Sequence, residues 1–136
     1  MAVEITIQYE KDLHCIATHG PSQDRLPTDA PTDNQGRGQH FSPTDLLATA
    51  LGTCMLTTMG IGAKARGLNI DGATAQVIKE MGSTPRRHVA VLKVHLRMPA
   101  DVPMEAREVL QKIAQTCPVA VSLAPSTVVD LTMSYG

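Results

Sequence analysis

The sequence predicts a protein of the α+β class, and three observations lead to that prediction. Stretches of alternating apolar and polar residues, typical of strands, occur near both ends of the chain and in its second half. Two stretches with apolar residues at helical spacing, 46–65 and 103–116, stand among them. Strands and helices do not alternate regularly as βαβ units would. With 136 residues, 43% of them hydrophobic, we expect a single domain over residues 1–136.

The first 41 residues predict two strands and a long connection. Residues 3–9 alternate as a half-buried strand does, with one apolar face formed by Val3, Ile5, Ile7 and Tyr9. A shorter strand follows at 13–18, where Cys15 lies on the apolar side and is expected to be structural. Residues 20–41 are rich in Gly, Pro, Asp and Gln, with a short strand possible at 25–28. A connection this long either carries function or packs on a partner.

The next element is a helix whose start is marked by three residues. Ser42 suits the N-cap, Pro43 the first helical position, and Asp45 the acidic position of a capping box. Gly67 is expected to end the helix in a left-handed conformation. Gly52 and Gly60 each cost about 1 kcal/mol relative to Ala inside a helix, which indicates that something packs closely there. We therefore expect a buried core helix, too polar for a bilayer span.

The remaining elements are a hairpin, a second helix and a last strand. Residues 73–81 and 86–98 predict the hairpin, and 103–116 the helix, which Pro118 ends. A short helical turn is expected at 119–123. The inward-facing residues of the second hairpin strand and of the last strand are expected to be Ala90, Leu92, Val94, Leu96, Met98, Val129, Leu131, Met133 and Tyr135.

Composition excludes several classes of partner. The formal net charge is −1, aromatic residues make up 2%, and there is no Trp, so we expect neither nucleic acid nor a membrane as a partner. The N-terminus lacks the basic and apolar regions of a signal peptide, and a cytoplasmic location is the default expectation. In that reducing compartment a cysteine pair would be catalytic or sensing rather than a structural disulfide.

Cys54 and Cys117 are the candidate reactive residues. Each lies on the apolar stripe of a predicted helix, so each could instead be a small core residue. Cys117 also stands at a helix break beside Pro118, where exposed N–H groups of a new helical turn favour a thiolate. The two cysteines could meet in the core, although they are distant in the sequence.

The histidines do not predict a metal site. His14 and His19 are five residues apart and His88 and His95 seven apart, so on a regular strand the members of each pair point to opposite faces. There is also no C-x-x-C and no H-E-x-x-H motif.

Several motifs resemble the OsmC/Ohr family of organic hydroperoxide reductases and osmotically induced proteins. They are FSPTDLLATALGTCMLTTMGIGAKARGL, then KEM, PRRH and TCPVAVSL. The resemblance spans essentially the whole chain. It implies antiparallel sheets wrapped around a central buried helix, and an intertwined homodimer with active sites at the subunit interface.

The resemblance also implies roles for the two cysteines. Cys54 corresponds to the peroxidatic cysteine, which attacks an organic hydroperoxide and becomes a sulfenic acid. Cys117 corresponds to the resolving cysteine, which forms a disulfide with Cys54. A dithiol reductant, lipoyl-type or similar, returns both to thiols. No metal or organic cofactor is required.

Two departures from the family pattern affect the site. Family members with strong activity carry a glutamate after the proline of the helix start, where this chain has Thr44. Asp45 follows, but its interpretation as the capping-box acid is preferred. The arginine that stabilises the thiolate in the family is expected to be Arg37, with Arg25 as the alternative.

The leading functional hypothesis is a cysteine-based, thiol-dependent peroxidase of organic hydroperoxides. The first alternative is a non-catalytic dimer of the same fold that binds or senses in stress, favoured by Thr44. A further alternative is a disulfide exchanger that acts on thiol adducts.

Overall fold

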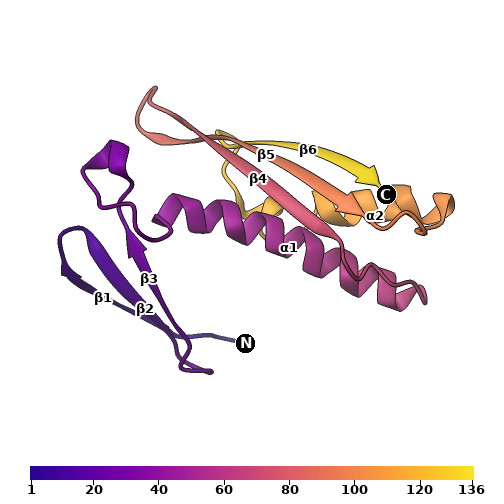
Figure 1. Cartoon of the computed structure of the whole chain (residues 1–136), viewed down its shortest axis with the longest axis horizontal. Coiled ribbons are helices and arrows are strands. Elements are labelled where there is room, and N and C mark those ends of the chain that lie inside the picture. The colour runs from indigo at the N-terminus through magenta and orange to yellow at the C-terminus, as the bar shows by residue number, and fades with distance from the viewer. The chain divides into compact units, whose positions relative to one another are not determined.

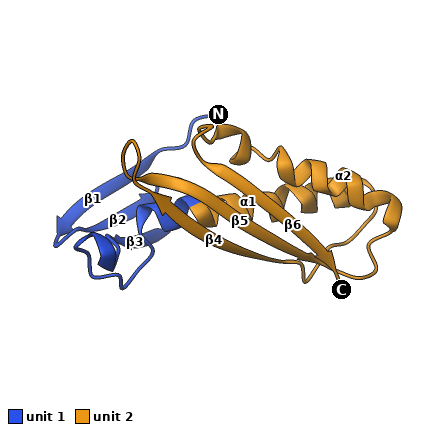
Figure 2. Cartoon of the chain, turned by 90° about the horizontal axis from the view of Figure 1, so that it is seen from above, with its two compact units in different colours: residues 1–47 blue, residues 48–136 orange.

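The computed structural model describes residues 1–136, which form two compact units, residues 1–47 and residues 48–136 (Figure 2). The single domain expected over the whole chain stays a prediction. The elements in chain order, which Figure 1 labels in part, are β1 (Ile5–Lys11), β2 (His14–His19), β3 (Arg25–Asp29), the 3₁₀ turn η1 (Thr32–Asn34), α1 (Pro43–Ala65), β4 (Thr74–Gly82), β5 (His88–Met98), α2 (Met104–Gln115), the 3₁₀ turn η2 (Ala120–Ser122) and β6 (Val128–Tyr135).

The N-terminal unit contains an antiparallel sheet with the strand order β1-β2-β3. The short strand suggested at 25–28 is confirmed as β3. The half-buried character expected for residues 3–9 is wrong for the single chain, because every residue of β1 is exposed. Ile7, for example, keeps 67% of its surface accessible. The alternation correctly predicted the strand, but its apolar face is exposed.

The start of α1 has the hydrogen bonds of a capping box. The backbone N–H of Asp45 donates to Ser42 Oγ at 3.0 Å, and the N–H of Ser42 donates to Asp45 Oδ2 at 2.9 Å. Ser42 is only 1% exposed, so its hydroxyl is satisfied without water. The expected N-cap is confirmed. The helix ends as expected too, since Gly67 has a φ of +70° and the N–H of Leu68 bonds to the carbonyl of Ala63.

In the unit formed by residues 48–136, α1 packs closely against β4 and α2. A Cβ added at Gly52 would lie 2.9 Å from a methyl group of Val77 in β4. One added at Gly62 would lie 2.5 Å from the Cδ1 of Ile113 in α2. The close packing expected at Gly52 is therefore confirmed. At Gly60 the nearest atom would be 4.0 Å away, which is ordinary contact, so the close packing expected there is wrong. The buried residues of α1 are Ala48, Leu51, Gly52, Met55, Met59 and Ala63.

The sheet of this unit has the order β4-β5-β6 and mixes two kinds of pairing (Figure 1). The expected hairpin is confirmed, with β4 and β5 antiparallel. The pairing of β5 with β6 is parallel, which corrects the expectation of purely antiparallel sheets. A parallel neighbour needs a crossover connection, and α2 lies in the segment that joins these two strands.

A bulge in β5 changes which residues face the core. Glu80 pairs with Val91, but the next residue of β4, Met81, pairs with Val89, so Ala90 is an extra residue on β5. Leu92 and the alternate residues after it are buried as expected, yet before the bulge Val89 is buried in place of Ala90. The alternation of apolar and polar residues in the sequence assumes a regular strand, so it cannot predict this change in the face that is buried.

α1 is long and apolar enough to cross a membrane by length and composition alone, so the expectation that it is too polar for a bilayer span is wrong by this measure. Its buried residues recur at helical spacing along one face, as in the core helix of a folded domain. The expectation of a core helix agrees with this burial.

Candidate active site

The structure brings the two predicted reactive cysteines together. Cys54 lies in the middle of α1, and Cys117 follows the last turn of α2. Their thiols lie close enough for Cys54 to raise the pKa of Cys117, and both cysteines are free thiols. Gly52 and Gly62 flank Cys54 on α1 and allow the close approach of the sheet and of α2. These close contacts and both cysteines belong to the unit 48–136.

The two thiols differ in their accessibility. Cys117 is 1% exposed, whereas Cys54 is half-buried, at the edge of the buried face of α1 between Leu51 and Met55. A small molecule from solvent can therefore reach the sulfur of Cys54 more readily than that of Cys117.

The sulfur of Cys117 lies at the start of a helical turn. The backbone N–H of Ala120 donates a hydrogen bond to its Sγ at 3.4 Å. The backbone carbonyl of Cys117 in turn accepts from the N–H of Val121 at 3.1 Å. The donors that the sequence predicted beside Cys117 are thus present.

These donors do not decide the charge of Cys117. Burial raises the pKa of the Cys117 thiol, the N–H of Ala120 opposes this, and the neighbouring Cys54 thiol raises it further. The net pKa is above the ordinary value of a thiol. The expectation that the helical turn would favour a thiolate at Cys117 is therefore wrong, because desolvation outweighs the hydrogen bonds. Cys117 keeps its proton at neutral pH.

The residues at the helix start are engaged in the cap. Asp45 accepts the Ser42 N–H, as expected of the capping-box acid. The hydroxyl of Thr44 lies 3.2 Å from that of Ser42. The family's glutamate position thus carries a hydroxyl group.

Arg37, the first candidate for the thiolate-stabilising arginine, lies in the N-terminal unit. Its guanidinium Nη2 is 3.3 Å from Oδ1 of Asp29, and its side chain is 43% exposed. Arg25, the alternative, begins β3 and lines a shallow hollow of the first sheet with Ile7 and Ile16. A role of either arginine at Cys54 stays a prediction.

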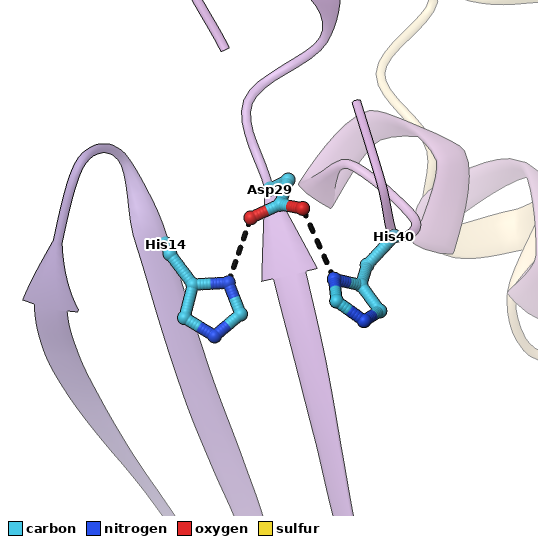
Figure 3. A group of neighbouring side chains, drawn as sticks. All are labelled: His14, Asp29 and His40. Atoms are coloured by element: carbon cyan, nitrogen blue, oxygen red, sulfur yellow. Dashed lines mark hydrogen bonds and ion pairs between the residues drawn. The ribbon is translucent and has the colours of Figure 1, made fainter. Parts of the chain in front are cut away.

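The structure also brings together three residues that the sequence did not connect. His14, at the start of β2, and His40, in the segment before α1, both bond through Nδ1 to the carboxylate of Asp29 at the end of β3 (Figure 3). From the sequence, histidines could be considered only as pairs within one predicted strand. His40 stands in the irregular connection, where no periodicity predicts the direction of a side chain.

Fold and cysteine pair together define an α+β protein that holds two reduced thiols in contact within its core. The profile of the OsmC-like protein family matches residues 36–132. This chain belongs to the OsmC-like family, as its sequence motifs predicted.

Solved structures agree with this assignment. A protein of Psychrobacter arcticus 273-4, provisionally assigned to osmotic stress induction and detoxification, is 39% identical over 95% of this chain and 93% of its own, with a TM-score of 0.89. Organic hydroperoxide resistance proteins of Legionella pneumophila (15% identity, 98% and 97% coverage, TM-score 0.79) and Elizabethkingia anophelis (16%, 100% and 97%, 0.80) share the fold. No curated protein matches the chain.

Proposed function

We propose that this protein is a thiol-dependent peroxidase that reduces organic hydroperoxides to alcohols. The observation that supports this most directly is the contact between the reduced thiols of Cys54 and Cys117. The family includes proteins named for resistance to organic hydroperoxides. Buried apolar residues near Cys54 on α1, such as Leu51 and Met55, suit an organic peroxide better than hydrogen peroxide.

In the first step Cys54 is the nucleophile, because its sulfur is the more accessible of the two. Its thiolate attacks the terminal oxygen of R–O–O–H and the O–O bond breaks. The leaving alkoxide takes a proton and departs as the alcohol, while Cys54 becomes a sulfenic acid. Arg37, or Arg25 in its place, would stabilise the thiolate in this step.

In the second step Cys117 attacks the sulfur of the sulfenic acid. The S–S bond forms, and hydroxide leaves as water with the proton that Cys117 gives up. Burial of Cys117 keeps it from reacting with peroxide itself. A dithiol reductant, lipoyl-type or similar, then exchanges with the disulfide, so two thiols are restored and the reductant is oxidised.

We propose that the working form is a cytoplasmic homodimer. The strand β1 has an apolar face that is open to solvent in the single chain, with Ile5, Ile7 and Tyr9 each more than half exposed. A patch of this kind is unusual on a monomer and typical of an interface. A second copy of the chain would cover it.

A second candidate function is a non-catalytic dimer that binds or senses in stress. The observation that favours it is Thr44, whose hydroxyl hydrogen-bonds with Ser42 at the position of the family's glutamate. Intact mass after mild peroxide treatment separates the two functions. Loss of two hydrogens, mapped to a Cys54–Cys117 link, supports the enzyme, and an unchanged mass supports binding alone.

The direct test is consumption of cumene hydroperoxide by the purified protein with dihydrolipoamide as the reductant. We expect Cys54→Ser to abolish turnover. Cys15→Ser, which removes a half-buried thiol of the first sheet, is the matched control and should turn over normally. Turnover by Cys54→Ser at the rate of the unaltered protein would refute the peroxidase.

A further inference from the structure

The N-terminal unit contains three potential metal ligands that converge on one point. His14 comes from the start of β2, Asp29 from the end of β3, and His40 from the segment that leads to α1 (Figure 3). One ligand atom from each residue lies within 4.8 Å of the others. All three belong to residues 1–47. The arrangement is therefore internal to one compact unit.

The carboxylate of Asp29 is the centre of this group. Its side chain is fully buried, with 0% of its surface exposed. Oδ1 lies 2.7 Å from His14 Nδ1 and 3.3 Å from Arg37 Nη2, and Oδ2 lies 3.0 Å from His40 Nδ1 and 3.2 Å from the N–H of Gln39. Four groups of the same unit, from His14, Arg37, Gln39 and His40, thus converge on this one buried carboxylate.

The two imidazole rings present the same nitrogen to this carboxylate. The rings are 5.6 Å apart at their centroids and tilted by 52°, so they approach Asp29 from different directions. Which ring nitrogen carries the proton depends on the tautomer. In the tautomer with the proton on Nε2, the Nδ1 lone pair of each ring is free to bind a cation.

A further carboxylate is placed to support that tautomer. Oε1 of Glu10 lies 3.4 Å from Nε2 of His14, on the side of the ring away from Asp29. Metal-bound histidines commonly donate the N–H of their other ring nitrogen to a carboxylate, which fixes the tautomer. Glu10 would accept this N–H from His14. The contact gives an independent indication that His14 can bind through Nδ1.

We propose that His14, Asp29 and His40 form a binding site for a divalent transition-metal ion, with Zn²⁺ as the preferred occupant. Two imidazole nitrogens and one carboxylate oxygen are a ligand set of zinc and of neighbouring metals, whereas Mg²⁺ and Ca²⁺ take mainly oxygen ligands. Solvent can supply the fourth ligand, because the side chain of His40 is 42% exposed. Arg37 is comparably exposed and can turn outward as the ion takes its place beside Oδ1.

A metal at this site would link the segment that contains His40 to strands β2 and β3 of the first sheet. His40 stands two residues before the N-cap Ser42, while His14 and Asp29 belong to neighbouring strands that pair directly with each other. The ion would therefore fix the segment that leads into α1. The site uses neither Cys54 nor Cys117, so it goes beyond the proposed peroxidase chemistry.

The test is titration of the purified full-length protein with Zn²⁺ alone, by calorimetry. Thiols also bind zinc, so the titration is repeated on a Cys54→Ser/Cys117→Ser variant, which keeps the site intact. We expect both proteins to bind one ion per chain. His40→Gln should weaken binding by about tenfold or more. His19→Gln is the matched control, because His19 is an exposed histidine at the far end of β2 from His14, and its ring bonds to Ser22. This variant should bind as the unaltered protein does.

Co²⁺ gives a second measurement on the same proteins. Nitrogen and oxygen ligands give weak visible bands without the strong near-ultraviolet band of a cobalt–thiolate bond. Circular dichroism shows whether each variant is folded. Asp29→Asn replaces the buried carboxylate ligand and is a second test of the site if it folds. His40→Gln changes an exposed residue, so the test rests on this variant if Asp29→Asn does not fold. Three results would overturn the proposal: no stoichiometric binding to the double serine variant, equal affinity of His40→Gln, or a thiolate band that remains in that variant and so assigns the metal to Cys15.

Discussion

The thiol of Cys54 lies close enough to that of Cys117 to raise its pKa, and the sulfur of Cys117 also accepts the backbone N–H of Ala120 at 3.4 Å. One sulfur thus faces both a helical N–H and a second thiol, yet the pKa of Cys117 is raised, because burial has the largest effect. The pair is unsymmetrical. One cysteine is buried and keeps its proton, and the other is partly open to solvent.

This asymmetry predicts the result of removing Cys117. In Cys117→Ser, Cys54 should still react once with cumene hydroperoxide, but its sulfenic acid has no thiol partner and goes on to the sulfinic and sulfonic acids. Intact mass spectrometry should show the gain of two and then three oxygen atoms, and catalytic turnover should be lost. The control is the unaltered protein, which should lose two hydrogens under the same treatment. Full turnover by Cys117→Ser would remove Cys117 from the cycle.

The raised pKa of Cys117 predicts how disulfide formation depends on pH. Only the thiolate attacks, and below the pKa its fraction rises about tenfold for each pH unit. The second step should therefore become faster as the pH rises from about 6 to about 8, where Cys117 is still mostly protonated. Quench-flow with mass spectrometry measures it as the conversion of sulfenic acid to disulfide. Peroxide attack on Cys117→Ser over the same range provides the separate dependence of the first step. A second step that is independent of pH would contradict the raised pKa.

The packing of α1 predicts opposite effects for two glycine substitutions. In Gly52→Ala the new methyl group would lie 2.9 Å from the stiff, β-branched Val77, and we expect a loss of about 1–3 kcal/mol in stability, partly offset by helix propensity. In Gly60→Ala the nearest atom is 4.0 Å away, so the gain in propensity, about 0.5–1 kcal/mol, should dominate. Urea unfolding at fixed protein concentration measures both. Equal midpoints for the two variants would contradict the close approach at Gly52.

Local patterns in the sequence predicted most of the fold. Ser42 and Asp45 act within one helical turn, and they fixed the start of α1 correctly. The bulge at Ala90 was missed, because it depends on which residue of β4 faces each residue of β5. Pairing across the chain also decides that β6 lies parallel to β5. The local sequence preferences of a strand predict neither the bulge nor the direction of pairing.

The candidate site, like the fold, could be predicted from the sequence only in part. Motif resemblance predicted Cys54 and Cys117 as the reactive residues, and their redox roles stay a prediction. The charge of Cys117 could not be predicted, because it results from burial competing with the N–H of Ala120. The group around Asp29 was missed as well, since His40 stands in an irregular loop whose path only the folded chain defines.

The open apolar face of β1 predicts that a single charge will separate the proposed dimer. Ile7 is 67% exposed in the single chain and lies in the middle of that face, between Ile5 and Tyr9. In a dimer that covers this face, Ile7→Glu would bury an unpaired carboxylate at the interface, which is strongly unfavourable. Light scattering after size exclusion should give the mass of a dimer for the unaltered protein and of a monomer for Ile7→Glu. Gln8→Glu adds the same charge to the opposite face of the strand and should remain a dimer. A dimer that persists in Ile7→Glu at micromolar concentration would mean that another surface joins the two copies.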